Sequence, residues 1–429
     1  MTRSTRDPRP APARPREPSG RRGSVLAGAP LAVALSVVGL AVVALGTFVL
    51  ASGNLPISAG GHQPGASGAG GGNIVVQSAT PSGVVVVPTE EPGITVPGTL
   101  LYAKDGNIWI ESNGQATQLT TSGNDSMPSF SPDGQSVFFI RTRPVIGSWP
   151  VLGVRARYSM HVPTVMRVPV AGGTPKAILD GLYPPGPNMW MAWIREPVLS
   201  PDGRTLAILS DLPNPSKSDV VLQFYNLKTR KLTNPNLGEV SPLGHQNPAW
   251  RPDGKVLAYV YNNRNGAIGA PQIYGYTAAT GKARAISGPG YLQPSWSPDG
   301  KYLAVTKTSA YGTDVAIINA STGAEVTLLT NDGASWAPVW SPAGDQIAYL
   351  HIDGQVVDLR LVQLAGSYGD WTPGNTLDLT QDAGLDSISR PDWFVPASQM
   401  PAATPAPSAS GGGPSGSPAG GTSPSPSPS

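Results

Sequence analysis

The sequence contains no cysteine and only four histidines among its 429 residues. Without a thiol the chain can form no disulfide, and it cannot carry the lipid-modified cysteine of a lipoprotein. The histidines show no metal-ligand spacing; they are His62, His161, His245 and His351. No Gly-x-Ser-x-Gly motif stands between an expected strand and an expected helix. We therefore expect no metal and no cofactor, and we assign no catalytic residue.

The charges of the chain are unevenly distributed. Residues 1–24 hold seven arginines against Asp7 and Glu17, so they carry +5, whereas the rest of the chain carries −3 of the total of +2. A basic, proline-rich segment of this kind is typical of a disordered tail. Because the remainder is slightly acidic, we do not expect the folded part to bind nucleic acid.

Residues 25–51 form a run of 27 residues without a charge, fourteen of them Val, Leu or Phe. As a helix this run would be about 40 Å long, enough to cross a hydrocarbon layer of about 30 Å. Arginines precede it and no Lys or Arg follows until Lys104, which predicts a cytoplasmic tail and an extracytoplasmic remainder. The alternative is a cleaved signal peptide ending near Val49-Leu-Ala51. A run of 27 is long for a signal peptide, so we predict a single-pass anchor in the cell membrane.

Two further segments have compositions that do not build a core. Residues 52–98 are rich in Gly, Ser, Pro and Val and predict a flexible stalk, and residues 397–429 predict a disordered Pro/Ser/Gly tail. The foldable domain is therefore expected over residues 99–396, and its size is sufficient for a large core without disulfides.

One phrase recurs through this domain. Its copies are Pro128-Ser-Phe-Ser-Pro-Asp-Gly134, Pro197-Val-Leu-Ser-Pro-Asp-Gly203, Pro248-Ala-Trp-Arg-Pro-Asp-Gly254, Pro294-Ser-Trp-Ser-Pro-Asp-Gly300, Pro338-Val-Trp-Ser-Pro-Ala-Gly344 and a shortened Pro391-Asp-Trp-Phe-Val-Pro396. The leading prolines are 69, 51, 46, 44 and 53 residues apart. These intervals have the length of a four-stranded propeller blade and exceed ankyrin or tetratricopeptide units.

Each copy predicts a first strand followed by a turn, in which proline presets φ and glycine accepts a positive φ. In the clearest unit the expected strands are Gln293–Ser297, Tyr302–Thr306, Asp314–Asn319 and Glu325–Thr330. Residues 99–120 supply strands two to four of a blade without a first strand, and Arg390–Phe394 supplies a first strand alone. Joined, they complete one blade and latch the ring. We predict an all-β, six-bladed β-propeller preceded by one transmembrane helix.

The repeats resemble the six-bladed propeller repeats of TolB-like proteins, with their Pro-x-Trp-Ser-Pro-Asp-Gly phrase and later Leu-Thr ending. Leu-Thr endings occur at Leu119-Thr120, Leu232-Thr233, Leu329-Thr330 and Leu379-Thr380. The resemblance covers about residues 99–396 and implies the fold. It does not fix the function, because such repeats also occur in peptidase-associated propellers and surface proteins. TolB is a soluble periplasmic protein with an extra N-terminal domain, whereas this chain is expected to have an anchor and a stalk.

The repeated residues are interpreted as scaffold. The aspartates Asp133, Asp202, Asp253 and Asp299 lie in the turns, and a structural role is favoured over metal binding because Ala343 replaces one of them. A large apolar residue recurs two places after the leading proline and is expected to anchor neighbouring blades; these residues are Phe130, Leu199, Trp250, Trp296, Trp340 and Trp393.

The longest interval marks the candidate site. Residues 143–163 lie between the second and third strands of their blade, and residues 182–196 lie between its fourth strand and the next blade. In a propeller both connections emerge on the same face, so the two insertions should be neighbours. Tryptophan, tyrosine and arginine are enriched at binding hot spots. The predicted binding residues are Trp149, Arg155, Arg157, Tyr158, Tyr183, Trp190 and Trp193.

Two functions follow as hypotheses. The first is a membrane-tethered, extracytoplasmic binding module for an envelope protein, a peptide or a glycan, with no enzymatic activity. The second is a metal-dependent hydrolase of the lactonase type, which would need acidic and amide side chains converging on the channel. The first-strand segments contain mostly Ser, Val, Ala and Pro, so the first hypothesis is favoured.

Overall fold

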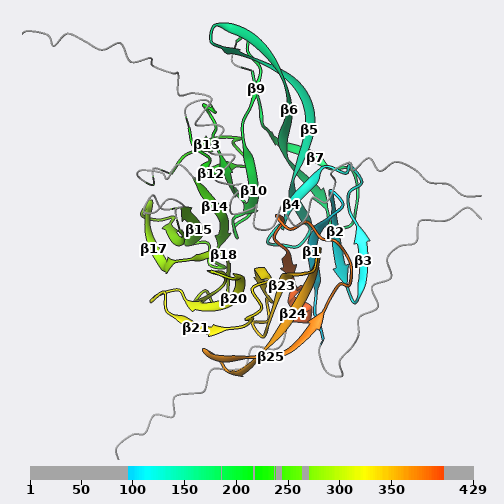
Figure 1. Ribbon diagram of the computed structural model, residues 1–429, viewed down its shortest axis with the longest axis vertical. Helices are drawn as coiled ribbons and strands as arrows, with labels where there is room; N and C mark the ends of the chain where they lie inside the picture. Colours follow the sequence, from blue (N-terminus) through cyan, green and yellow to red (C-terminus); the bar gives the residue numbers. More distant parts are fainter. Residues whose placement is uncertain are drawn as a thin grey trace, which may run out of the picture. The chain divides into compact units, whose positions relative to one another are not determined.

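The computed structural model describes residues 95–400 except for 185, 216–217, 236, 238–243 and 263–269. These residues belong to the second of two units into which the chain divides, residues 66–429. They form six four-stranded antiparallel sheets arranged in a ring around a central channel (Figure 1). The predicted all-β, six-bladed propeller is therefore confirmed.

Blade 1 consists of β26 (Asp392–Phe394), β1 (Thr99–Lys104), β2 (Asn107–Ser112) and β3 (Gln115–Gln118). Blade 2 consists of β4 (Asp125–Phe130), β5 (Ser136–Val151), β6 (Val154–Pro169) and β7 (Lys176–Asp180). Blade 3 consists of β10 (Ile194–Leu199), β11 (Thr205–Ser210), β12 (Val221–Asn226) and β13 (Leu232–Thr233). Between blades 2 and 3 lies a separate pair, β8 (Leu182–Tyr183) and β9 (Trp190–Met191).

Blade 4 consists of β14 (His245–Trp250), β15 (Val256–Asn262), β16 (Pro271–Thr277) and β17 (Lys282–Pro289). Blade 5 consists of β18 (Tyr291–Trp296), β19 (Tyr302–Ser309), β20 (Gly312–Asn319) and β21 (Glu325–Leu328). Blade 6 consists of β22 (Ser335–Trp340), β23 (Gln346–Asp353), β24 (Val356–Ser367) and β25 (Asp370–Asp378). A single short helix, the 3-10 helix η1 (Ala397–Gln399), occurs among the described residues.

The two ends of the described chain meet in blade 1, as predicted. Strand β26 pairs antiparallel with β1, so that Leu100 lies opposite Trp393. The Trp393 indole donates a hydrogen bond to the carbonyl oxygen of Pro97 at 2.8 Å, and Gly98 N donates to Gln399 Oε1 at 2.9 Å. The latch joins residues about 300 positions apart and completes blade 1 with its first strand.

The Pro-Asp-Gly turns are held by their own side chains. The Ser131 hydroxyl donates to Asp133 Oδ1 at 2.5 Å and accepts a hydrogen bond from Ser136 N at 2.9 Å. Hydrogen bonds from Ser131 and from the Gln135 N–H lower the pKa of Asp133. In blade 4, Arg251 replaces the serine and forms an ion pair with Asp253 at 2.8 Å. The aspartates therefore stabilise turns, which agrees with the interpretation from the sequence.

The apolar residues of the phrase pack between blades, also as predicted. Phe130, Leu199, Trp296, Trp340 and Trp393 are all less than a tenth exposed. The Trp296 indole in blade 5 donates to the carbonyl oxygen of Ala249 in blade 4 at 3.0 Å, which fixes the contact between neighbouring blades. The core is thus a series of inter-blade layers rather than one central cluster.

One prediction from the sequence falls outside the described residues, and another is wrong. The expected transmembrane helix, residues 25–51, lies outside the described residues, and no helix within 95–400 is long and apolar enough to cross a membrane. The expected connection at 143–163 is wrong in its conformation, because β5 and β6 continue through it as one hairpin of two sixteen-residue strands. Figure 1 shows this hairpin extending well beyond the ring.

Candidate functional site: the aromatic insertion

The β5–β6 hairpin is continuous because polar and apolar residues alternate along β6 and a tight turn joins the two strands. Val151 pairs with Val154, and Leu152 and Gly153 between them have φ values of +50° and +80°. Two successive residues with positive φ form the two-residue turn that matches the twist of a hairpin. Pro144 and Pro150 lie on a ribbon with open edges, where a missing N–H is tolerated.

The second insertion lies against the first, as the sequence analysis predicted. Ser148 and Met189 exchange two backbone hydrogen bonds of 2.9 Å, so that the segment before β9 joins the edge of β5. Arg155 extends the contact, since its Nη1 donates to the carbonyl oxygen of Pro187 at 2.7 Å and to Asn188 Oδ1 at 2.9 Å. We call residues 143–163 and 182–196 together the aromatic insertion.

Three aromatic side chains meet within the aromatic insertion. The ring centroid of Trp190 lies 5.8 Å from that of Trp149 and 5.5 Å from that of Tyr158, with the Tyr158 ring edge-on at 87°. Edge-to-face geometry at this spacing is favourable beyond the area that it buries. Tyr183 pairs with Trp190 across the β8–β9 pair. Trp190 is therefore the centre of the cluster.

Gly147 allows this close packing. A Cβ at Gly147 would lie 2.5 Å from Met160 Cε and 2.7 Å from the carbonyl oxygen of Met189. Real Cβ atoms do not approach other atoms so closely, so any side chain here would push β5 away from its neighbours. Glycine at this position brings the β9 segment and β6 to the same part of β5.

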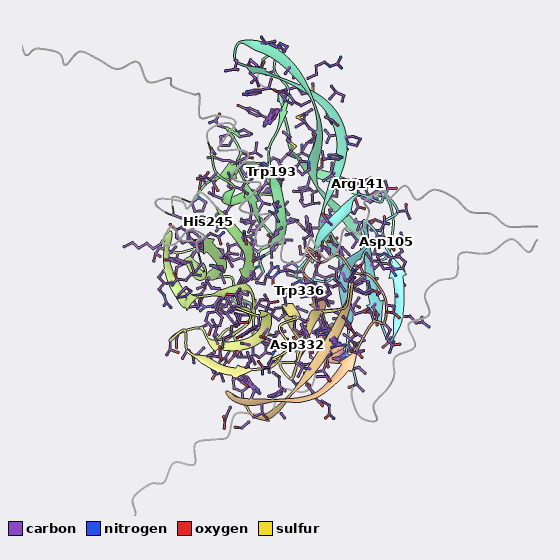
Figure 2. The ribbon with its side chains drawn as sticks, viewed as in Figure 1. Asp105, Arg141, Trp193, His245, Asp332 and Trp336 are labelled. Atoms are coloured by element: carbon purple, nitrogen blue, oxygen red, sulfur yellow. The ribbon has the colours of Figure 1, made fainter. Side chains whose placement is uncertain are left out.

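A groove of about 540 Å³ lies at the base of the aromatic insertion. Its lining is largely apolar and includes Tyr158, Met160, Trp190, Trp193, Ile194 and Ile388. Trp193 is 44% exposed and Ile388 is 53% exposed, so both present apolar surface to solvent. Figure 2 shows Trp193 on the segment that runs from β9 into β10, beside the projecting hairpin. A concave surface with aromatic walls is typical of a binding site.

Two carboxylates outside the groove bind residues of the aromatic insertion. Asp180 forms a bidentate ion pair with Arg143 at 2.8 and 3.0 Å. Burial raises the pKa of Asp180, but hydrogen bonds from Arg143 and Leu182 N outweigh it, so the pKa is lowered overall. Asp211 is 4% exposed and accepts a hydrogen bond from Trp193 N at 2.8 Å. Burial raises the pKa of Asp211 to about 7.

Only some of the seven predicted binding residues line the groove. Tyr158, Trp190 and Trp193 line the groove, and Trp149 and Tyr183 support Trp190 from outside it. The side chain of Arg155 is engaged with the 187–188 turn. Within the described residues Arg157 forms no ion pair, and its exposed side chain does not line the groove. The sequence did not identify Met160, Ile194 and Ile388 as groove residues. Ile388 comes from a loop almost 200 residues further along the chain, and no sequence pattern pointed to it.

The channel is a second candidate site, lined by first strands of all six blades, with a volume of about 350 Å³. In five blades the residue before the leading proline has a positive φ and forms a β-bulge; these residues are Met127, Glu196, Asn247, Gln293 and Ala337. Three of them carry a carboxylate or an amide, which the sequence analysis overlooked. Of these three, Glu196 lines the channel itself.

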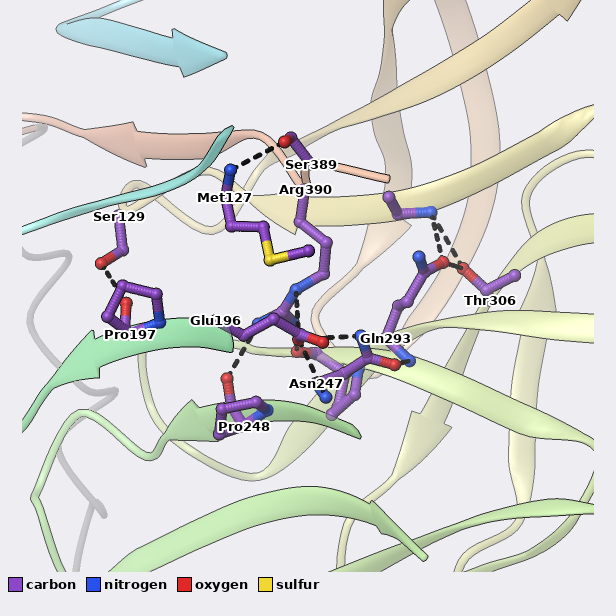
Figure 3. Close-up of polar contacts among 12 residues, drawn as sticks. Met127, Ser129, Glu196, Pro197, Asn247, Pro248, Gln293, Thr306, Ser389 and Arg390 are labelled. Carbon is purple, nitrogen blue, oxygen red and sulfur yellow. Dashed lines mark hydrogen bonds and ion pairs between the residues drawn. The ribbon is translucent and has the colours of Figure 1, made fainter. Parts of the chain in front are cut away.

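These polar groups are satisfied by one another (Figure 3). Glu196 Oε2 accepts hydrogen bonds from Asn247 N and Nδ2 at 2.9 and 3.0 Å, and Gln293 Oε1 accepts one from Ala337 N at 3.0 Å. The Arg390 guanidinium extends to the same region and donates to the carbonyl oxygens of Pro248 and Pro294 at 2.8 and 3.2 Å. Arg390 brings a fixed positive charge to the place where a channel metal would bind. The donor set therefore does not fit a divalent ion.

Comparison with known proteins agrees with the architecture. Residues 191–381 match the PD40 family model, described as the TolB beta propeller domain. The described domain is a TolB-like β-propeller. No curated protein matches the chain. TolB from Acinetobacter baumannii is 20% identical with a TM-score of 0.50, and the match covers 69% of this chain and 66% of that one. A protein assigned as TolB from Agrobacterium tumefaciens is 16% identical with a TM-score of 0.46, over 69% and 92%.

The family match covers only part of the ring, because blades 1 and 2 lie before residue 191. The β5–β6 hairpin and β8 lie before residue 191, outside the residues that match the family model. The chain also covers slightly less than two thirds of the Acinetobacter TolB. Most of the aromatic insertion is therefore not covered by the family match, and we interpret it from its own chemistry.

Proposed function

We propose that this TolB-like propeller is a non-enzymatic binding module that holds a partner from the cell envelope in the groove of the aromatic insertion. The observation that carries the proposal is the apolar groove of about 540 Å³ lined by Tyr158, Trp190 and Trp193. Rigid aromatic side chains in such a pocket can bury a large apolar area with little loss of conformational entropy.

The chemistry of the groove favours a protein or peptide over a glycan. The polar side chains at its lining are few; besides the Tyr158 hydroxyl, they are Ser126, Thr142, Ser159, His161 and Arg195. Buried sugar hydroxyls need hydrogen-bond partners, whereas apolar peptide side chains need only complementary surface. We expect a peptide segment with an aromatic or branched apolar residue to occupy the groove.

The proposed location rests on the sequence. The uncharged run at residues 25–51 and the arginines before it would tether the chain to the cell membrane with the propeller outside. Residues 52–98 would then give the propeller freedom to reach partners near the membrane. A binding module needs this reach if its partner is another envelope component.

Photocrosslinking in cells tests the proposal on the full chain. A photoreactive phenylalanine analogue replaces Trp193, which lines the groove and is 44% exposed. The control position is Tyr311, which is 94% exposed at the turn between β19 and β20. We expect a discrete crosslinked protein at position 193 that is missing at position 311. The same adducts at both positions, or none at 193, would contradict the proposal.

The hydrolase hypothesis is not supported by the channel. A catalytic divalent ion would have to bind where Arg390 donates to two carbonyl oxygens. The oxygen atoms of Glu196, Asn247 and Gln293 already accept hydrogen bonds from the neighbouring blades. The binding function therefore remains the better proposal, and a calcium titration distinguishes the two.

A further inference from the structure

The tip of the β5–β6 hairpin is apolar and exposed. Leu152 is 87% exposed, Val154 71% and Val151 42%, and Ile146 further along the ribbon is 55% exposed. Several adjacent apolar side chains in water are unfavourable unless something covers them. The tip lies outside the groove, since none of these four residues lines it.

The charges behind the tip are all positive. The outer hairpin, residues 144–163, contains Arg155 and Arg157 and no Asp or Glu. The next arginine towards the ring, Arg143, forms an ion pair with Asp180, so these two residues add no net charge. Within the described residues Arg157 has no acidic partner and its side chain is exposed. The hairpin thus carries an apolar end followed by a cationic band, although the chain beyond residue 24 is acidic overall.

Aromatic residues follow at the same level. Trp149 pairs with Ala156 in the third residue pair from the Leu152–Gly153 turn, and Tyr158 pairs with Gly147 in the fifth. An apolar end, then tryptophan and tyrosine, with arginines beside them, is the order found where proteins contact the boundary between hydrocarbon and headgroups.

We propose that the hairpin tip binds the surface of an anionic phospholipid bilayer, with Leu152 and Val154 in the acyl boundary and Arg157 among the headgroups. Charge complementarity identifies the occupant, because an anionic surface attracts a cationic band that has no carboxylates. The hairpin projects beyond the ring, so the tip can reach a flat surface that the blades cannot (Figure 1). The inference uses the proposed tether only to keep the domain near a bilayer.

The absence of cysteine makes a direct test possible. The full chain with Leu152→Cys is labelled with an environment-sensitive fluorophore and reconstituted with phosphatidylcholine vesicles, with or without phosphatidylglycerol. Tyr311→Cys provides a matched control on the turn between β19 and β20. We expect a blue shift, and quenching by lipid-linked quenchers, at position 152 with phosphatidylglycerol. Arg157→Gln should lower the ratio of inserted to water-exposed probe about fivefold, and Arg204→Gln, in a Pro-Asp-Gly turn, should not.

Flotation of the vesicles separates the possible outcomes. If the chain floats and the probe at 152 remains in water, the tip does not bind lipid and this inference is wrong, whereas the tether stands. If flotation of the unlabelled chain is lost with Leu152→Ser, the tip is the only attachment, so the inference stands and the tether fails. If the chain does not float even with phosphatidylglycerol, both are wrong. A blue shift of equal size at positions 152 and 311 would also overturn the inference.

Discussion

Arg390 Nη2 donates a hydrogen bond of 2.8 Å to the carbonyl oxygen of Pro248, although 142 positions separate the two residues in the sequence. Arg390 directly precedes the last leading proline, and Pro248 is the leading proline of blade 4. The bond therefore crosses the channel from the latch side to another blade. Together with the bond to Pro294 O, it connects the closure of the ring to blades 4 and 5.

Replacing Arg390 with methionine should destabilise the ring. The change removes two charge-assisted hydrogen bonds and leaves Glu196, whose side chain is only 10% exposed, without the nearby positive charge. We expect a loss of about 2–4 kcal/mol in the free energy of unfolding, measured by chemical denaturation. An exposed control, Arg230→Met, should change it by less than about 0.5 kcal/mol.

A second substitution tests the role of Glu196. Adding Glu196→Gln to Arg390→Met removes the uncompensated carboxylate but keeps an oxygen that can accept from Asn247 N. The double variant should therefore be more stable than the sum of the single changes predicts. Additive effects would show that Arg390 and Glu196 act independently.

Gly147→Ala should open the outer part of the hairpin and leave the ring folded. Its Cβ would collide with Met160 and with the Met189 backbone, so the two hydrogen bonds between Ser148 and Met189 should weaken. Amide hydrogen exchange should become faster at positions 148 and 189 and remain unchanged in the blades. Gly288→Ala is the matched control, because a Cβ there meets nothing within 4 Å. Unchanged exchange in Gly147→Ala would contradict the packing described for β9.

Asp211→Asn should change how stability depends on pH. Burial raises the pKa of Asp211 to about 7 in the folded protein, from 3.8 as the ordinary value. The folded state therefore holds the proton more tightly, and this contribution is lost as pH rises between about 4 and 7. The variant should be more stable than the wild type at pH 8 by up to a few kcal/mol, and similar to it at about pH 4. An equal pH profile for both proteins would show that Asp211 is ionised in the fold.

Two other buried groups contribute to the same profile. Burial raises the pKa of Glu111 to about 7, so Glu111 also favours the fold at low pH. Burial lowers the pKa of His245 to about 4, so its contribution is present above about pH 6.5 and is lost as the pH falls to about 4. The difference between the wild type and Asp211→Asn isolates the carboxyl near Trp193.

Calcium should not stabilise the wild-type protein. Occupancy of a native-state site at 100 times its Kd would add about 2.7 kcal/mol of stability, which a thermal melt detects readily. Because the Arg390 guanidinium lies beside the convergent oxygens, we expect no shift in Tm up to millimolar calcium. A saturable increase in Tm, lost in Glu196→Gln, would revive the hydrolase hypothesis.

The ring could be predicted from the sequence because its determinants are local. Each Pro-Asp-Gly turn follows a first strand, and the predicted strand Tyr302–Thr306 lies within β19. The latch also followed, since the incomplete blade at residues 99–120 lacks only what Arg390–Phe394 supplies. Such features repeat, and their physical causes lie within a few residues of one another.

The site was only partly predictable. The neighbouring position of the two insertions followed from propeller topology, but Pro144 and Pro150 concealed the strands of the hairpin. Alternation from Val154 to Val162 was the signal that could have identified them. The carboxylate and amide groups near the channel belong to residues that directly precede the repeated phrase. These positions have a β-bulge in common but no common residue type, so the sequence repeat did not reveal them. Ile388 enters the groove through tertiary folding alone.

The affinity of the partner crosslinked at position 193 is the most direct test of groove binding. The wild type and Trp190→Ala would be compared by calorimetry, with thermal unfolding used to confirm that the ring is intact. Because Trp190 lies between Trp149 and Tyr158 and lines the groove, its loss should weaken binding about 30-fold or more. The control Arg204→Ala, in a Pro-Asp-Gly turn, should bind like the wild type. Equal affinities for the wild type and Trp190→Ala would contradict binding by the aromatic insertion.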